Sequence, residues 1–523
     1  MPTHPPCEPR ARGGVLLTLA LVARLAAQDP VIYTIGDLDR TAHTAVVVAT
    51  FATDGQQQLD VFLPVWSPGF YRVENHAEQV TDFAAADAEG KALAVERPAP
   101  NRWRVAAGGA ARVVATYTLK CTRASVTTNQ ISDDFAVFCG PATFVAVAGA
   151  APRPCEVRLE LPALWPHAAT GLQASEDGAP HHFRAPDYDW LCDSPIVAGT
   201  LRTETFDVAG ARHELVCFGD VGDWDAALAA RKLQPIAAEL CHMFGAVPFD
   251  RYVFLDGFRP ANGGLEHLNS TLITSRARTP ADDPGWLAFV AHEYCHTFNV
   301  KRLRPIELGP FDYEHPPSTP SLWISEGLTT YLANLACARC GVASPERWLQ
   351  MMSDSIRGLQ GSAGRKVQTL ADASLSVWSG SMSGTGGDPR KTVSYYVKGP
   401  VVGLLLDARL RAASSGAHGL DDLMRGAYAR WSGARGFRPE EFEALANELA
   451  GTDLAPFFDR TLRSTDELDY SEVLQWFGLR FRPAADDAPR AQRWVLEPSA
   501  QATAEQHAHL RALLTPTPAA RAR

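Results

Sequence analysis

Short runs of alternating apolar and polar residues dominate the first third of the chain, a pattern typical of half-buried β-strands. The clearest runs are 45–51, 59–63, 112–119 and 156–161. Turn-forming stretches such as Ser67-Pro68-Gly69 separate them, without intervening helical segments. We therefore predict an N-terminal antiparallel β-sandwich domain over residues 31–205.

A helical period replaces this alternation after residue 219, and the first helix is predicted from Trp224 to Phe244. Asp283 can cap a second helix, in which Pro284 fits the first turn. The other predicted elements are a strand at 252–255, a loop at 379–387, and helices at 319–341, 400–412, 420–431, 439–449 and 454–462. This pattern predicts a mostly helical domain over residues 206–465.

Residues 466–523 form a short C-terminal extension, with one predicted strand at 493–496 and one predicted helix at about 502–514. The predicted fold class is therefore α+β and multidomain, with the β-sandwich domain preceding the helical domain.

Residues 1–28 have the organisation of a signal peptide. Arg10 and Arg12 precede the apolar run 14–22, and the small residues Ala26 and Ala27 follow. This run is too short to span a bilayer stably, and no later segment is long and apolar enough. We expect export to the periplasm or the medium, with no stable membrane span after signal removal. The alternative is a cytoplasmic protein with a disordered extension.

The composition is that of a globular protein: 523 residues, 46% hydrophobic and 21% charged. A net charge of −10 argues against nucleic acid as a partner. Of the 10 cysteines, Cys7 lies in the predicted signal peptide, which leaves an odd number. Those in the first half could form bridges in an exported protein. Cys337 and Cys340 lie inside a helical pattern, so we predict that they pack.

The candidate chemistry begins with His-Glu-Tyr-Cys-His at 292–296. On a helix, His292 and His296 lie on one face and can hold a zinc ion between their imidazoles. Glu293 is then directed at a water on the metal and can act as the general base.

A catalytic zinc needs a third protein ligand and one open position. The carboxylates next along the chain are Glu307, Asp312, Glu314 and Glu326. We favour Glu326, because it begins an amphipathic helix that can pack beside the first. Gly327 follows it and permits a close approach of two helices.

Several motifs in one order now carry a family resemblance: SPGFY, YDWLCDSPI, GGLEH, HEYCHTFNVKRLRP, WISEGLTTY and SYYVKG. The chain resembles the glycyl aminopeptidase family of zinc metallopeptidases from about residue 60 to its end. It is more distantly similar to the aminopeptidase N clan. The resemblance implies an N-terminal β domain followed by a thermolysin-like catalytic domain.

The resemblance also implies roles for individual residues. It supports Glu326 as the third metal ligand, because Glu326 lies in the family's Trp-x-x-Glu-Gly context. It implies that Gly263, Gly264 and Glu266 of GGLEH bind substrate, with Glu266 on the free α-ammonium group. It implies that Tyr396, rather than Tyr395, donates to the oxyanion.

Two features depart from the family pattern. Cys295 stands where the family usually has an aromatic residue; its thiol either approaches the metal or packs, and we favour packing. Longer members end in a PDZ domain, and the C-terminal extension is too short to form one.

We therefore predict an exported aminopeptidase with one Zn2+ per chain. It would remove small N-terminal residues, glycine or alanine, from peptides with a free N-terminus. One alternative is an endopeptidase of the same chemistry, and the other is a non-catalytic pseudo-peptidase that binds peptides. Substrates with blocked N-termini distinguish an aminopeptidase from an endopeptidase. Metal analysis distinguishes the enzyme from a pseudo-peptidase.

Overall fold

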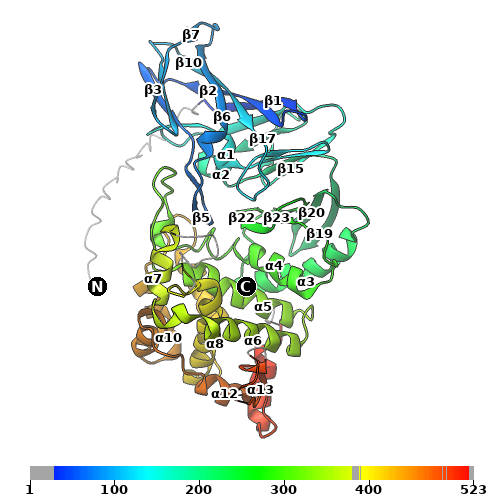
Figure 1. The fold of residues 1–523 in the computed structure, drawn as a ribbon, viewed down its shortest axis with the longest axis vertical. Coiled ribbons are helices and arrows are strands. Elements are labelled where there is room, and N and C mark those ends of the chain that lie inside the picture. The colour runs from blue at the N-terminus through cyan, green and yellow to red at the C-terminus, as the bar shows by residue number, and fades with distance from the viewer. Residues whose placement is uncertain (1–28, 380–387, 389, 486, 490–491, 517–523) are drawn as a thin grey trace, which may run out of the picture.

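The computed structural model describes residues 29–379, 388, 390–485, 487–489 and 492–516. The predicted signal peptide, residues 1–28, lies outside the described residues. Residues 380–387 of the predicted loop also lie outside them. Sheets occupy the upper half of Figure 1 and helices the lower half, as the fold class predicted.

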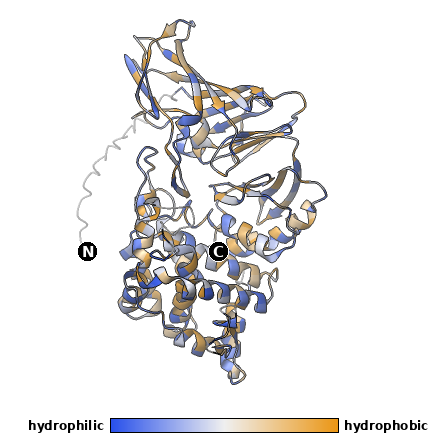
Figure 2. Ribbon diagram, viewed as in Figure 1, coloured by the Kyte–Doolittle hydropathy of each residue, from blue (hydrophilic) through white to orange (hydrophobic). Residues whose placement is uncertain are grey.

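An eight-stranded sheet forms the largest unit of the upper half, in the order β16-β17-β14-β1-β2-β10-β6-β7. Its strands are β1 (Val31–Asp39), β2 (Thr44–Ala52), β6 (Val80–Asp87), β7 (Ala92–Leu93), β10 (Arg112–Lys120), β14 (Cys155–Leu159), β16 (Gln173–Ala174) and β17 (His182–Ala185). Neighbours are antiparallel except β1 and β14, which are parallel, so the prediction of a purely antiparallel sandwich was wrong at this pair. In β2 and β10 every second residue is buried. Figure 2 shows hydrophobic and hydrophilic residues mixed along the strands of the upper half.

Two four-stranded sheets accompany it, in the orders β13-β3-β9-β8 and β11-β12-β18-β15. Their strands are β3 (Gln58–Phe62), β8 (Val95–Ala99), β9 (Arg102–Ala106), β11 (Gln130–Ile131), β12 (Phe135–Phe138), β13 (Ala146–Val147), β15 (His167–Thr170) and β18 (Ile196–Gly199). Short helices lie between strands: η1 (His76–Gln79), α1 (Gly140–Thr143) and α2 (Tyr188–Cys192). One apolar core joins the eight-stranded sheet to both, and it contains Tyr33, Val61, Tyr117 and Phe138.

A hairpin of β4 (Trp66–Ser67) and β5 (Phe70–Val73) leaves these sheets and descends toward the helices (Figure 1). Trp66 Nε1 donates to the Asp312 carbonyl oxygen at 2.8 Å, which fixes the hairpin to the second half of the chain. Gly69 turns the hairpin with φ +92°, a conformation that favours glycine.

A five-stranded mixed sheet opens the second half, in the order β19-β20-β21-β23-β22. Its strands are β19 (Arg202–Val208), β20 (Ala211–Gly219), β21 (Arg251–Phe258), β22 (Gly263–Glu266) and β23 (Ser270–Ser275). The sequence analysis predicted one strand in this region, within β21. Residues 252–258 of β21 and 270–274 of β23 are all buried, so these two strands lack the alternation that reveals a half-buried strand.

Helices α3 (Ala226–Phe244) and α4 (Pro284–Cys295) pack together and against this sheet. The remaining helical elements are η2 (Ile306–Leu308), η3 (Trp323–Leu328), α5 (Thr329–Arg339), α6 (Pro345–Gly361), η4 (Ala363–Lys366), α7 (Leu370–Leu375), η5 (Val377–Ser379), α8 (Tyr395–Ala413), α9 (Leu420–Trp431), α10 (Pro439–Ala450), α11 (Ala455–Phe458) and η6 (Asp459–Arg463). Helix α9 has the predicted bounds, but α8 begins earlier than predicted and continues through Pro400. Helix α6 was not predicted.

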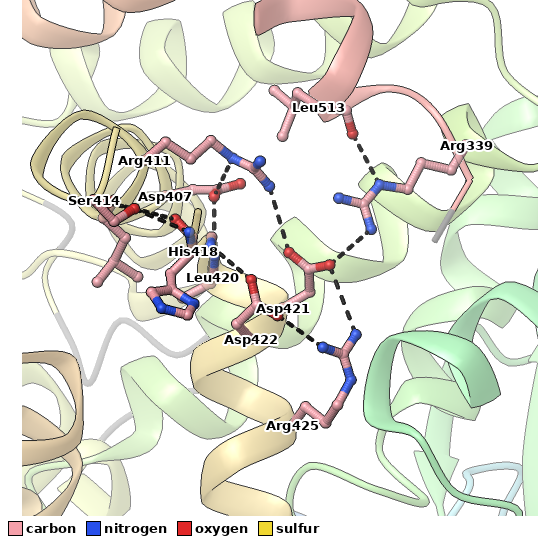
Figure 3. A network of polar contacts seen from close by, with 12 residues as sticks. Arg339, Asp407, Arg411, Ser414, His418, Leu420, Asp421, Asp422, Arg425 and Leu513 are labelled. Atoms are coloured by element: carbon pink, nitrogen blue, oxygen red, sulfur yellow. Dashed lines mark hydrogen bonds and ion pairs between the residues drawn. The ribbon is translucent and has the colours of Figure 1, made fainter. Parts of the chain in front are cut away.

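The C-terminal extension contains α12 (Ser471–Phe477), β24 (Leu479–Phe481), β25 (Leu496–Pro498) and α13 (Ala504–Leu513). A buried polar network ties it to the helices (Figure 3). Arg339 of α5 donates to the Leu513 carbonyl oxygen at 2.8 Å and pairs with Asp421 of α9 at 3.2 Å. Arg411 of α8 pairs with Asp407 at 2.8 Å and with Asp421 at 3.4 Å. The extension is therefore packed onto the helical part.

The cysteines of the described residues are all unpaired, so the bridges considered for the first half are not formed there. Cys295 is fully buried and burial raises the pKa of its thiol, in agreement with a packing role. Among the described residues, no helix has the length and apolar character needed to cross a membrane.

Candidate functional site

Helix α4 positions the two histidines. Its N-cap Asp283 accepts from the Trp286 amide, and buried residues including Leu287, Val290 and Tyr294 anchor the helix in the core. His292 lies in the last turn and His296 is the C-cap residue, still with helical dihedral angles. Their Nε2 atoms are 2.9 Å apart.

The Glu326 carboxylate meets both rings. Its Oε2 atom lies 3.5 Å from His292 Nε2 and 3.2 Å from His296 Nε2. Glu326 belongs to η3, a π-helical stretch that leads directly into α5. Such stretches are uncommon and often coincide with functional sites.

Hydrogen bonds at the far side of each ring assign the tautomers. His296 Nδ1 lies 2.8 Å from the Asn299 carbonyl oxygen, which can only accept, so this nitrogen carries a proton. Thr330 Oγ1 donates to the Glu326 carbonyl oxygen at 3.0 Å, and therefore accepts from His292 Nδ1 at 3.1 Å. In the neutral rings both Nε2 lone pairs then face the same point.

Two lone pairs and a carboxylate oxygen cannot share one point without a positive charge between them. Burial lowers the pKa of His296, but the carboxylates of Glu326, Glu266 and Glu293 together more than reverse this and bring it to about 10. The position therefore favours a cation, and the donor set of two imidazoles and one carboxylate is one that zinc prefers. These three side chains can hold a metal ion.

Glu293 points to the same space from α4 and is 5% exposed. Burial raises the pKa of its carboxyl group to about 8, close to neutrality, as a group that accepts and releases protons requires. The backbone of Gly264 on β22 closes over it: a Cβ atom at residue 264 would lie 2.3 Å from Glu293 Oε1.

Glu266, two residues further along β22, is 4% exposed. Its Oε1 atom is buried and has no hydrogen-bond partner among the described residues. Burial raises the pKa of this carboxyl group as well. Gly69 of the hairpin packs against it, because a Cβ atom at residue 69 would lie 2.3 Å from Glu266 Oε1.

Tyr395 and Tyr396 open α8 beside the metal-binding residues. The rings of Tyr396 and His292 have their centroids 6.1 Å apart. Helix α8 reaches this place because Gly399 contacts Gly327: a Cβ atom on either glycine would approach the other's Cα within 2.6 Å. The close approach expected at Gly327 is therefore made with α8, and not with the histidine helix as the sequence analysis supposed.

A cavity of about 450 Å3 joins these groups. Every residue predicted for the site lines it: Gly263, Gly264, Glu266, His292, Glu293, His296, Glu326 and Tyr396. Burial raises the pKa of Tyr396 well above its usual value, so its hydroxyl remains a donor.

The other carboxylates considered as third ligand make different contacts. Glu314 pairs with Arg102, Glu307 accepts from Thr319 at 3.1 Å, and Asp312 accepts from backbone amides of its own loop. His267, which follows Glu266 in the GGLEH motif, lies 3.2 Å from Asp193 through Nδ1.

Sequence reasoning assigned no role to Tyr71, Thr330 and Asn334, which also line the cavity. Thr330 and Asn334 follow Glu326 at intervals of four along the same helical face, a spacing that could have identified them. Tyr71 stood in the SPGFY motif, but its Oη atom reaches Glu326 Oε1, at 3.1 Å, from 255 positions away in sequence.

Two family models match parts of the chain. Residues 32–200 match the model of the peptidase M61 N-terminal domain, and residues 285–402 match that of M61 glycyl aminopeptidase. A comparison with curated protein sequences gives no match.

Solved structures also resemble the chain. The crystal structure of an aminopeptidase N family protein from Idiomarina loihiensis is 28% identical, with a TM-score of 0.82 over 88% of this chain and 80% of that chain. An M1 zinc metallopeptidase mutant from Deinococcus radiodurans bound to a Tyr-Ser-Ala substrate is 14% identical, with a TM-score of 0.53 over 85% of this chain and 95% of that chain. Yeast LTA4 hydrolase in complex with bestatin is 12% identical, with a TM-score of 0.52 over 85% and 68%. The last two show similarity of fold alone.

Proposed function

The chain belongs to the M61 glycyl aminopeptidase family and is a peptidase, and on this premise we propose that it is a zinc-dependent aminopeptidase. It would hydrolyse the first peptide bond of peptides with a free N-terminus, using one zinc ion per chain.

One observation carries the proposal: three buried groups of the kind that bind zinc converge on one point. The donors are the Nε2 atoms of His292 and His296 and the Oε2 atom of Glu326, at most 3.5 Å apart. When bound there, zinc would polarise the scissile carbonyl group and lower the pKa of a water molecule.

Glu293 is the proposed general base. Its carboxylate would take a proton from the attacking water and pass it to the leaving amine. Gly264 supports this role, because its missing side chain lets the Glu293 carboxylate approach β22. Tyr396 is the proposed oxyanion donor, since a buried phenol donates a hydrogen bond without bringing a charge.

Glu266 is the proposed group that binds the substrate's α-ammonium. Its unpartnered buried oxygen needs a donor, and an ammonium group supplies both hydrogen bonds and positive charge. Gly263 and Gly264 would bring the edge strand β22 close to the peptide. An endopeptidase of the same chemistry would leave Glu266 without this partner.

The preference for glycine or alanine and the export of the protein are further parts of the proposal. The first is supported by the family, whose model is named for glycyl aminopeptidase. The second is supported by the charged and apolar organisation of residues 1–28.

The test compares alanine p-nitroanilide, glycyl peptides and their N-acetylated forms. We expect turnover of the free forms, none of the acetylated forms, and a loss of at least about 100-fold in kcat for Glu293→Gln. Metal analysis should find one zinc per chain in both proteins, because Glu293 is not a proposed ligand. Turnover of acetylated peptides would identify an endopeptidase. A protein that binds peptides but hydrolyses none, with or without zinc, would be a pseudo-peptidase.

A further inference from the structure

Tyr71 connects the N-terminal sheets to the proposed metal site. It lies on β5, at the tip of the hairpin that descends from the upper half of the molecule (Figure 1). Its hydroxyl donates to Glu326 Oε1 at 3.1 Å, and its side chain is 8% exposed. One of the candidate metal ligands therefore receives a hydrogen bond from a different part of the chain.

The Tyr71 ring is held in place by neighbouring aromatic residues. Its centroid lies 6.0 Å from that of Trp378 and 6.5 Å from that of Tyr395, both in edge-to-face geometry. Trp378 also packs edge-to-face on Trp66 of the same hairpin, at 5.4 Å. These contacts leave the hydroxyl little freedom to move away from Glu326.

The two carboxylate oxygens of Glu326 make different contacts. Oε1 accepts from Tyr71, while Oε2 faces the Nε2 atoms of His292 and His296. A carboxylate on a flexible side chain can rotate and present either oxygen. A donor on one oxygen fixes the plane of the group and directs the other toward the cation.

We propose that Tyr71 is a positioning residue for the metal site, acting through Glu326. This inference rests on the proposed function, because it assumes that Glu326 binds a cation. It makes the N-terminal sheets a functional part of the catalytic centre, and it predicts that the loss of one hydroxyl group weakens metal binding about 10- to 100-fold.

The test replaces Tyr71 with Phe, which removes the hydroxyl and retains the ring. Tyr313→Phe is the matched control: Tyr313 is buried, packs on Trp66, and donates to Asp189 Oδ1 at 2.8 Å, away from the metal ligands. Zinc affinity of the full chain is measured by competition with a fluorescent chelator. We expect a loss of about 10- to 100-fold for Tyr71→Phe and less than about 2-fold for the control.

A role in stability alone gives a different result. Tyr71→Phe would then lower the thermal stability of the metal-free protein and leave zinc affinity unchanged, which would overturn the proposal. Kinetics give a second measure: with zinc saturating, kcat should fall more than KM rises, because Glu266 is untouched. A rise in KM with kcat retained would contradict the inference.

A double-mutant cycle tests whether the effect passes through Glu326. In a Glu326→Ala background, Tyr71→Phe should change zinc affinity by less than about 2-fold. An equal loss in both backgrounds would refute the proposed route. If the unaltered protein fails to bind zinc, the proposed function is wrong. If the Tyr71→Phe protein binds zinc normally, only the positioning role of Tyr71 is wrong.

Discussion

Replacing Gly264 with alanine should disable the proposed general base and leave the metal ligands in place. The added Cβ atom would lie 2.3 Å from Glu293 Oε1 and 2.8 Å from its Cγ atom, both closer than a real Cβ approaches any atom. Gly264 has no positive φ angle, so alanine introduces no backbone strain on β22. The substitution therefore acts through the Glu293 side chain.

The size of the effect follows from these distances. Contacts below 3.0 Å are essentially never found for a Cβ atom, so the Glu293 carboxylate must move by about 1 Å. A misplacement of about 1 Å in a catalytic group costs about 100-fold in rate, which corresponds to about 2.7 kcal/mol in the activation free energy. We expect kcat on alanine p-nitroanilide to fall by this factor.

The assay combines steady-state kinetics, metal analysis and thermal unfolding. Zinc content should remain that of the unaltered protein, because Gly264 contacts Glu293 and not the three ligands. Gly426→Ala in α9 is the control: its Cβ atom would meet Leu445 at 3.4 Å, an ordinary contact far from the cavity. A Gly264→Ala protein with kcat within about 3-fold of normal would refute the role of Glu293 as base.

Three further predictions concern the other carboxylates and the metal. Gly69→Ala should raise KM for free peptides about 10- to 100-fold, measured by initial rates, because its Cβ atom would lie 2.3 Å from Glu266 Oε1 and its φ of +92° disfavours alanine. Burial raises the pKa of Asp256 from 3.8 to about 7, so ionisation of Asp256 destabilises the fold progressively as the pH rises through this range. Asp256→Asn should therefore increase the free energy of unfolding by about 4 kcal/mol at pH 8 and by little at pH 4, measured by urea denaturation. Chelation should lower the melting temperature of the unaltered protein, and Glu326→Ala, which weakens zinc binding, should reduce this difference.

Local patterns in the sequence revealed much of the helical half. Helix α9 has the predicted bounds and α10 extends one residue beyond the prediction, because both carry an apolar stripe with clear ends. Helix α6 was missed although Ser344 caps it and Trp348, Met352, Ile356 and Leu359 line one face. In the five-stranded sheet only the central strand β21 was predicted, from its apolar run at 252–255. Strand β23 was missed although residues 270–274 are buried, because hydrophobicity does not alternate along it.

In the site too, residues close together in the sequence were predicted, and contacts between distant segments were not. The spacing of His292 and His296 required only helical geometry, and Glu326 was favoured from the start of the next predicted helix and from the family resemblance. That helix is buried on nearly all sides, so the predicted amphipathic character was wrong. Tyr71 could not be assigned in this way, because its contact with Glu326 joins residues 255 positions apart. Such a pairing depends on how the hairpin folds over the helices, which periodicity does not describe.

The charges in the cavity give an independent reason to prefer an aminopeptidase to an endopeptidase. Glu266, Glu293 and Glu326 are all buried, at 5% exposure or less. Lys301 acts on Glu266 electrostatically but is paired with Asp193 at 2.5 Å. Burial raises the pKa of Glu266 and of Glu293, so the cavity disfavours their charged forms and a bound cation would stabilise them. A metal ion and a substrate ammonium group would each bring positive charge to these carboxyl groups, whereas the internal bond of a peptide would bring none. The arrangement of Glu266 is therefore explained if the substrate brings a free N-terminus into the cavity.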